Sequence, residues 1–131
     1  PVEAERERKS VGVEDTFDRD VADILVLRGF LRELSVRVSE RLGRSGLQGR
    51  TVTVKVKFAD FRQVTRSRTL DEPVDDAATL ERIGSELLAD TGAGTLPVRL
   101  LGLQTSHFGD RDREDGFWEQ LELPLEGGIG G

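Results

Sequence analysis

The chain has 131 residues, of which 36% are hydrophobic and 34% are charged, with a net charge of -6. This length allows one domain and a tail, and no window approaches the roughly 18 consecutive apolar residues that a membrane-spanning helix needs. The absence of Cys excludes disulfides and thiolate chemistry, and a single His excludes a His-rich metal site. The chain also lacks Met, so we expect it to be a piece of a longer or processed protein.

The negative average charge hides a basic segment. Residues 50–68 carry six Lys or Arg and one Asp, whereas residues 69–90 carry seven acidic side chains and one Arg. Residues 107–131 carry seven acidic side chains and two Arg. Because charges act over about a Debye length of ~10 Å, a fold that separates these segments would present a basic patch on an acidic protein.

The N-terminal third predicts a strand followed by a long helix. Residues 1–9 are charged and mixed, as in a solvated linker. Residues 10–17 alternate between apolar and polar side chains, which is typical of a half-buried strand. Asp18 is the predicted N-cap of a helix whose apolar residues recur every three or four positions from Val21 to Leu42.

The next segment predicts a β-hairpin. Residues 51–58 alternate strictly, with Val and Phe on one side and Thr and Lys on the other. Residues 59–62 form a tight connection to a second strand over residues 63–70, which Glu72-Pro73 ends. Alternation in that strand places Arg66 and Arg68 toward the core, unless a bulge or the sheet edge releases their charged ends.

The remaining residues predict a second helix, a fourth strand and a tail. Asp75 or Asp76 caps the helix, which stops near Thr91-Gly92. Residues 98–106 form the last strand, and the acidic, Gly-rich residues 107–131 form a disordered tail. The order β-α-β-β-α-β therefore predicts an α+β domain with a four-stranded antiparallel sheet and two helices on one face. The other face would expose Thr, Lys, Ser, Arg and Gln, and we expect function to lie there.

Three segments, in one order and with matching helix lengths between them, carry a family resemblance. They are residues 9–14 (Lys-Ser-Val-Gly-Val-Glu) with Thr16-Phe17, residues 54–61 with 64–67, and residues 98–103. Together they resemble the little-finger domain of bacterial Y-family translesion DNA polymerases of the polymerase IV type. The resemblance implies a reversed ferredoxin-like domain over residues 10–106, whose open sheet face holds the backbone of primer–template DNA. It also implies that the catalytic carboxylates and their Mg²⁺ lie in an upstream palm domain, so we expect no catalytic residue, metal site or cofactor in this fragment.

The basic strands are expected to contact phosphates without reading bases, so binding should be independent of sequence and sensitive to salt. The alternative is an ordinary solvated sheet face. The candidate DNA-binding residues are Lys9, Ser10, Thr51, Thr53, Lys55, Lys57, Thr65, Arg66, Ser67, Arg68, Arg99 and Gln104.

The tail carries Gln120-Leu121-Glu122-Leu123-Pro124-Leu125, which is similar to the Gln-Leu-x-Leu-x-Leu peptide by which bacterial polymerases dock on the β sliding clamp. The Gln amide can form paired hydrogen bonds, and spaced Leu side chains can fill apolar pockets. We therefore expect Gln120, Leu121, Leu123, Pro124 and Leu125 to bind the clamp. Residues 107–119 would give this peptide reach, and Phe117 and Trp118 either add an anchor or contact the domain.

The expected function is a monomeric, non-catalytic module that grips DNA and tethers a translesion polymerase to the sliding clamp. DNA damage bypass of this kind places it in the bacterial cytoplasm, at the nucleoid. One alternative is a ferredoxin-like regulatory domain that binds a small ligand, which needs a polar pocket. Another is an RNA-binding module, which needs exposed aromatic side chains on the central strands.

Overall fold

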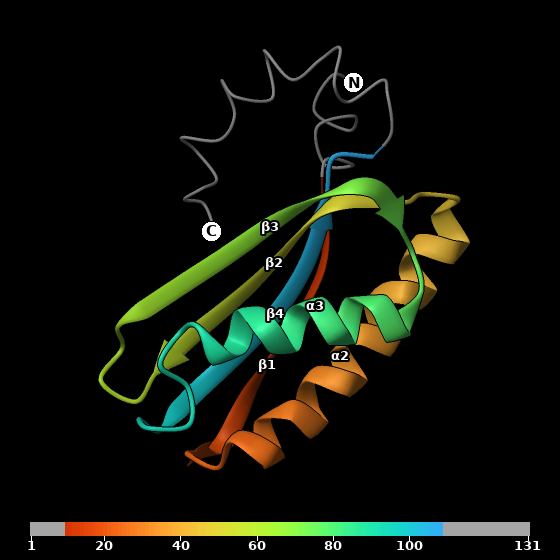
Figure 1. The fold of residues 1–131 in the computed structure, drawn as a ribbon. Helices are drawn as coiled ribbons and strands as arrows, with labels where there is room; N and C mark the ends of the chain where they lie inside the picture. Colours follow the sequence, from red (N-terminus) through yellow and green to blue (C-terminus); the bar gives the residue numbers. More distant parts are fainter. Residues whose placement is uncertain (1–9, 109–131) are drawn as a thin grey trace, which may run out of the picture.

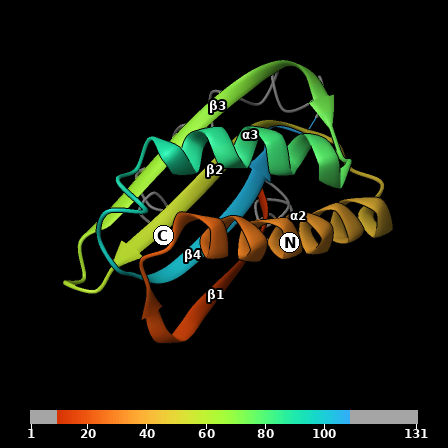
Figure 2. The same ribbon diagram turned by 60° about the horizontal axis from the view of Figure 1, so that its bottom comes forward.

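A computed structural model describes residues 10–108 of the chain. The elements are β1 (Ser10–Val21), α2 (Ile24–Ser45), β2 (Gly49–Phe58), β3 (Gln63–Val74), α3 (Ala77–Ala89) and β4 (Val98–Ser106). The strands form one antiparallel sheet in the order β1-β4-β2-β3. Both helices lie on the same face of this sheet (Figures 1 and 2). The predicted α+β fold with the order βαββαβ is confirmed.

The first strand is longer than its sequence pattern predicted, and the helix after it begins later. β1 continues to Val21, so the prediction of Asp18 as the N-cap is wrong. The cap is Asp23, whose carboxylate accepts a hydrogen bond from the Leu25 N–H at 2.9 Å. The pairing of β1 with β4 is irregular between Thr16 and Val21, which interrupts the alternation that marks a strand.

The hairpin of β2 and β3 has the predicted connection at residues 59–62. The Phe61 N–H donates to the Phe58 carbonyl at 2.8 Å, and the Phe58 N–H donates to the Arg62 carbonyl at 2.8 Å. β3 runs on to Val74, so the prediction that Glu72-Pro73 ends the strand is wrong. β3 is an edge strand, where the missing N–H of Pro73 is tolerated.

The second helix begins at the later of the two predicted caps. The Asp76 carboxylate accepts a hydrogen bond from the Thr79 N–H at 2.9 Å. This bond lowers the pKa of the Asp76 carboxyl below its ordinary value of 3.8. The helix ends at Ala89, just before the predicted stop at Thr91-Gly92.

The core lies between the sheet and the two helices. α2 and α3 each bury one apolar stripe against the valines of β2 and the leucines of β4. Gly84 of α3 faces Leu31 of α2, where an added Cβ would lie 3.2 Å from the Leu31 Cδ2. Within residues 10–108, the helices therefore cover one face of the sheet and leave the other face without a helix. The apolar residues with no exposed surface are Leu27, Leu31, Leu34, Val38, Leu42, Val52, Val54, Val56, Leu80, Leu88, Val98 and Leu101.

Candidate nucleic-acid interface

Strand register decides which side chains share the face that the helices leave bare. Val52, Val54 and Val56 of β2 are buried under the helices, so the residues between them point to the other side. Residues directly opposite in antiparallel strands point the same way. We call the resulting set the open face: Ser10, Gly12, Glu14 and Thr16 of β1, Leu100, Gly102, Gln104 and Ser106 of β4, Thr51, Thr53, Lys55 and Lys57 of β2, and Gln63, Thr65, Ser67 and Thr69 of β3.

Hydroxyl groups on the open face are paired across strands. The Thr51 and Thr69 hydroxyls lie 2.9 Å apart, and the Thr53 and Ser67 hydroxyls lie 2.8 Å apart. The Thr51 hydroxyl also lies 2.9 Å from Nδ1 of His107. Each hydroxyl can donate one hydrogen bond and accept two, so these pairs keep capacity for a further polar ligand.

Lys55 and Lys57 share the open face, as the alternation predicted. Lys55 Nζ lies 2.7 Å from Oε1 of Glu14, so its charge is already paired. Within the described part of the chain, Lys57 has no ion-pair partner. The alternation of residues 10–17 predicted that Glu14 lies on the polar side of its strand, but it did not predict the ion pair with Lys55. Lys57 is therefore the open-face cation that is available to an anion.

Arg66 and Arg68 lie on the opposite side of the sheet from the two lysines. Arg66 pairs with Val54 and Arg68 with Val52, with no bulge between them, so both side chains start on the helix side. The expectation that these arginines share the exposed sheet face with Lys55 and Lys57 is therefore corrected. Because β3 is an edge strand, their stems reach the carboxylates of α3 instead.

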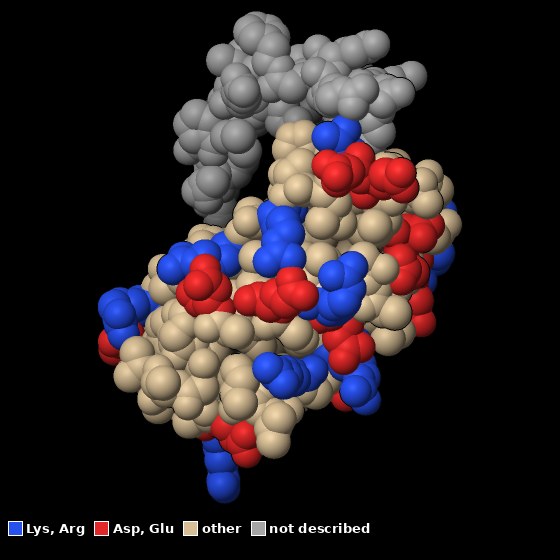
Figure 3. All heavy atoms as spheres, in the orientation of Figure 1, with Lys and Arg blue, Asp and Glu red and all other residues tan. Residues whose placement is uncertain are grey.

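Both arginines form exposed ion pairs at the α3 side of the sheet, one with α3 itself and one with its C-cap. Arg66 Nε lies 3.3 Å from Oδ2 of Asp90, and the Arg68 guanidinium bonds the Glu86 carboxylate. The hydrogen bond from Arg68 lowers the pKa of Glu86. On the helix side, basic and acidic side chains are interspersed (Figure 3). The basic segment of the sequence is therefore divided between two faces, and the basic patch is smaller than predicted.

The remaining predicted residues have distinct positions. Gln104 is exposed on the open face, opposite Thr53 and Gly12, and Ser10 is exposed where β1 begins. Arg99 lies in an irregular part of β4, with its guanidinium 4.8 Å from the centre of the Phe61 ring. Because Phe61 belongs to the connection between β2 and β3, Arg99 lies at the hairpin end of the sheet. Lys9 and the predicted clamp-binding peptide at residues 120–125 lie outside the described residues.

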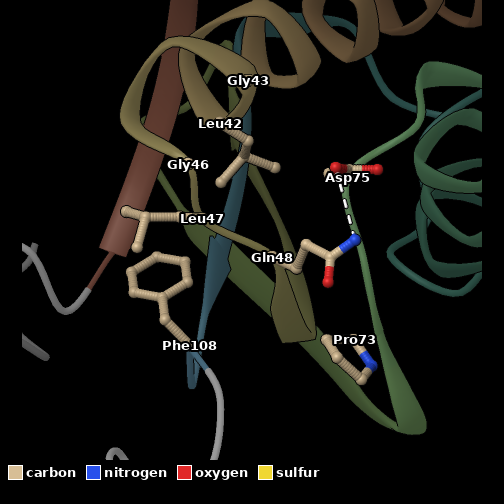
Figure 4. A pocket seen from close by; sticks show the side chains of 8 residues that line it. All are labelled: Leu42, Gly43, Gly46, Leu47, Gln48, Pro73, Asp75 and Phe108. Atoms are coloured by element: carbon tan, nitrogen blue, oxygen red, sulfur yellow. Dashed lines mark hydrogen bonds between the residues drawn. The ribbon is translucent and has the colours of Figure 1, made fainter.

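A hollow of about 390 Å³ lies between the end of α2 and the end of β3. The Gln48 amide donates to the Asp75 carboxylate at 3.4 Å, and Leu42, Leu47 and Phe108 supply apolar walls (Figure 4). Since its amide and carboxylate bond each other, the hollow lacks the convergent free polar groups that a small ligand needs. The regulatory-domain alternative is not favoured.

The open face also lacks the features of the other functional classes considered. None of its residues is aromatic, and Phe58 is buried in the core, which disfavours base stacking of the RNA-binding type. Among residues 10–108, no three His, Cys, Asp or Glu side chains form a group that could hold a metal ion. In the same range, no helix is long and apolar enough to span a membrane.

Comparison with known proteins identifies the family. Residues 8–123 match the C-terminal domain of the impB/mucB/samB family, so the chain belongs to that family. The chain is 41% identical over 126 residues to the DNA polymerase IV of Akkermansia muciniphila, covering 96% of this chain and 35% of that protein. It is 45% identical over 132 residues to the DNA polymerase IV of Streptomyces coelicolor, covering 96% of this chain and 27% of that protein. The chain thus spans about a third of the length of these curated relatives.

Solved structures agree with the fold and with the little-finger resemblance. One is the little-finger domain in a complex of the β-clamp processivity factor and the little finger of PolIV, with 27% identity and a TM-score of 0.64. This match covers 77% of the present chain and 90% of that one. The Dbh DNA polymerase in a post-insertion binary complex matches with a TM-score of 0.66 over 76% of this chain and 28% of that one. At 13% identity, this second match shows the fold alone.

Proposed function

We propose that this chain is the DNA-binding module of a polymerase IV-type translesion enzyme and that its open face grips the primer–template backbone. The observation that carries the proposal is a sheet face that no helix of residues 10–108 covers and that bears lysines and hydroxyl pairs in register across β2 and β3. Amines and hydroxyls of this kind bond phosphate oxygens without reading base edges. Lys57, Thr53, Thr65, Ser67 and Gln104 are the open-face residues that would contact the phosphates.

The proposed grip is weak and independent of sequence. The open face carries two lysines and one acid, on a protein with a net charge of -6. Binding that depends on few phosphate contacts falls in the non-specific class, with Kd of roughly 10⁻⁴ to 10⁻⁶ M at physiological salt. Ser10 and Thr51 extend the surface at the start of β1 and β2, and Arg99 extends it at the hairpin end. Lys9, outside the described residues, stays a predicted phosphate contact.

Replacing Lys57 by Gln should weaken the binding of duplex DNA by about 3- to 10-fold at low salt. The substitution removes the open-face cation that has no ion-pair partner among the described residues. It should also make the slope of log K against log salt less steep by about 0.9, because one fewer counterion is released. Fluorescence anisotropy with a labelled primer–template duplex over a salt series measures both quantities. An unchanged affinity and slope would contradict the proposed DNA contact.

The second half of the proposed function is attachment to the β sliding clamp through residues 120–125. The sequence Gln-Leu-Glu-Leu-Pro-Leu supports it, and a similar little-finger domain was solved in complex with a β-clamp processivity factor. Two weak attachments on one chain raise the effective concentration of each for the other. The domain holds the duplex while the peptide holds the clamp.

Replacing Gln120 by Ala should weaken clamp binding at least 10-fold, because the amide would lose its paired hydrogen bonds in the clamp pocket. Isothermal titration of the full chain with purified clamp gives the affinity. Glu122→Ala is the matched control, since residue 122 is a variable position of the motif and its substitution should change affinity less than 3-fold. Equal affinities for wild type and Gln120→Ala would remove the clamp assignment.

In this proposal, the polymerase activity of the parent protein lies in a domain other than the present one. The relatives are DNA polymerases of which this chain covers about a third. The catalytic carboxylates and their Mg²⁺ would lie in a palm domain, and the present residues would hold the substrate without acting on it. The parent would work as a monomer on DNA in the bacterial cytoplasm, at the nucleoid.

A further inference from the structure

The two charged groups nearest the centre of the open face are bonded to each other. Glu14 lies on β1 and Lys55 on β2, and β4 runs between these strands. Both residues pair with Gly102 of β4, one from each side. Lys55 Nζ lies 2.7 Å from Oε1 of Glu14, so the ion pair closes across β4 directly above Gly102.

Gly102 leaves room for this crossing. A Cβ at this position would lie 3.2 Å from the Glu14 Cβ and 3.6 Å from the Lys55 Cβ. Any side chain here would therefore stand between the two charged residues. The pair is only partly shielded, with 49% of the Glu14 side chain and 26% of the Lys55 side chain exposed. A ligand that approaches the open face meets both groups.

Because Lys55 is ion-paired, the two lysines of β2 differ in how readily they can bind a phosphate. Lys57, two residues along the same strand, has no ion-pair partner within residues 10–108. Among the open-face residues, Glu14 is the single acid. The neighbouring acid Asp15 starts on the helix side and bonds Arg37 of α2 at 2.8 Å. Among the residues that strand pairing assigns to the open face, Glu14 is thus the one carboxylate that competes with a phosphate for a lysine.

We propose that Glu14 sets the DNA affinity of the domain by occupying Lys55 as an internal counter-anion. This inference rests on the proposed function of the open face. A phosphate gains Lys55 only by displacing the Glu14 carboxylate, and the displaced carboxylate then repels the phosphate backbone. Partly exposed ion pairs are weak enough for such an exchange. In this proposal, Lys57 makes the primary contact with the phosphate backbone. The duplex is then bound weakly enough to slide along the open face.

The test compares charge-neutralising variants of the full chain in duplex-binding titrations at low salt. Glu14→Gln should tighten binding about 3- to 10-fold and steepen the salt slope by about 0.9, because one more lysine meets a phosphate. Asp15→Asn removes the same charge from the next residue but from the helix side, and should change affinity less than 2-fold. In a Lys55→Gln background, most of the gain from Glu14→Gln should disappear.

Each outcome bears on a separate statement. If Glu14→Gln leaves affinity unchanged or weakens it, the carboxylate positions Lys55 for phosphate or has no influence on binding, and the inference is wrong. If Glu14→Gln gives the same gain in the Lys55→Gln background, Glu14 acts by general repulsion, which also overturns the inference. Lys57→Gln, measured in the same series, reports on the proposed function itself. If Lys57→Gln shows the expected loss of affinity and Glu14→Gln shows no gain, only the proposed role of Glu14 is refuted.

Discussion

Replacing Phe58 by Ala should lower the free energy of unfolding by about 3–5 kcal/mol. The Phe58 side chain ends β2, is 2% exposed and lies within the core cluster. Truncation removes buried apolar surface and leaves a cavity that the close-packed surroundings fill only in part. Urea denaturation followed by far-UV circular dichroism measures the difference. Since a domain of this size has a total stability of about 5–15 kcal/mol, much of it would be lost.

Phe61→Ala is the matched control for this prediction. Phe61 lies three residues further along, in the hairpin connection, and is 65% exposed. Its described contact is the Arg99 guanidinium, 4.8 Å from the ring centre, and an exposed contact of this kind contributes about 0.5–1 kcal/mol. If Phe58→Ala and Phe61→Ala lowered the free energy of unfolding equally, the assignment of Phe58 to the core and Phe61 to the surface would be wrong.

Gly12→Ala should destabilise the domain by about 1–3 kcal/mol, although the same change is favourable at many other sites. A Cβ on Gly12 would lie 2.8 Å from the Gln104 Cβ and 3.2 Å from the Leu103 carbonyl oxygen. Neither neighbouring atom is the far end of a flexible side chain, so β1 and β4 must move apart. The same denaturation experiment reports the loss. Because Gly12 and Gln104 share the open face, the shift would also move a proposed DNA contact.

Gly29→Ala is the control of opposite sign. Gly29 lies inside α2, and an added Cβ there meets nothing within 4 Å. Alanine in a helix interior is more stable than glycine by roughly 0.5–1 kcal/mol. A Gly12→Ala variant that is as stable as wild type would contradict the close approach of β1 and β4.

The helices and strands could be predicted from the sequence because the spacing of apolar residues that marks each one lies within a short segment of the chain. The strict alternation of residues 51–58 assigned Lys55 and Lys57 to one face, and the structure agrees. The start of α2 was misplaced because Asp18 and Asp23 both precede apolar residues at helical spacing, and Val21 fits either a strand or a helix. The choice between them depends on how β1 pairs with β4, which no local window contains.

The parts of the interface that were missed depend on contacts between distant segments. Alternation placed Arg66 and Arg68 on the core side of their strand, but their partners are Asp90 and Glu86, which lie at the C-cap of α3 and within it, further along the chain. The bond between Glu14 and Lys55 requires the strand order β1-β4-β2 and a glycine at the crossing point. The sequence reveals neither the strand order nor the crossing.

The most direct test of the open face as the DNA-binding surface is a comparison of Lys57→Gln with Arg66→Gln. Each variant removes one positive charge from the sheet, Lys57 from the open face and Arg66 from the side that faces α3. Titrated with the same duplex, Lys57→Gln should bind about 3- to 10-fold more weakly than wild type, and Arg66→Gln should stay within 2-fold of it. If Arg66→Gln weakened binding as much as Lys57→Gln or more, the duplex would not be held by the open face alone, and the account would be contradicted.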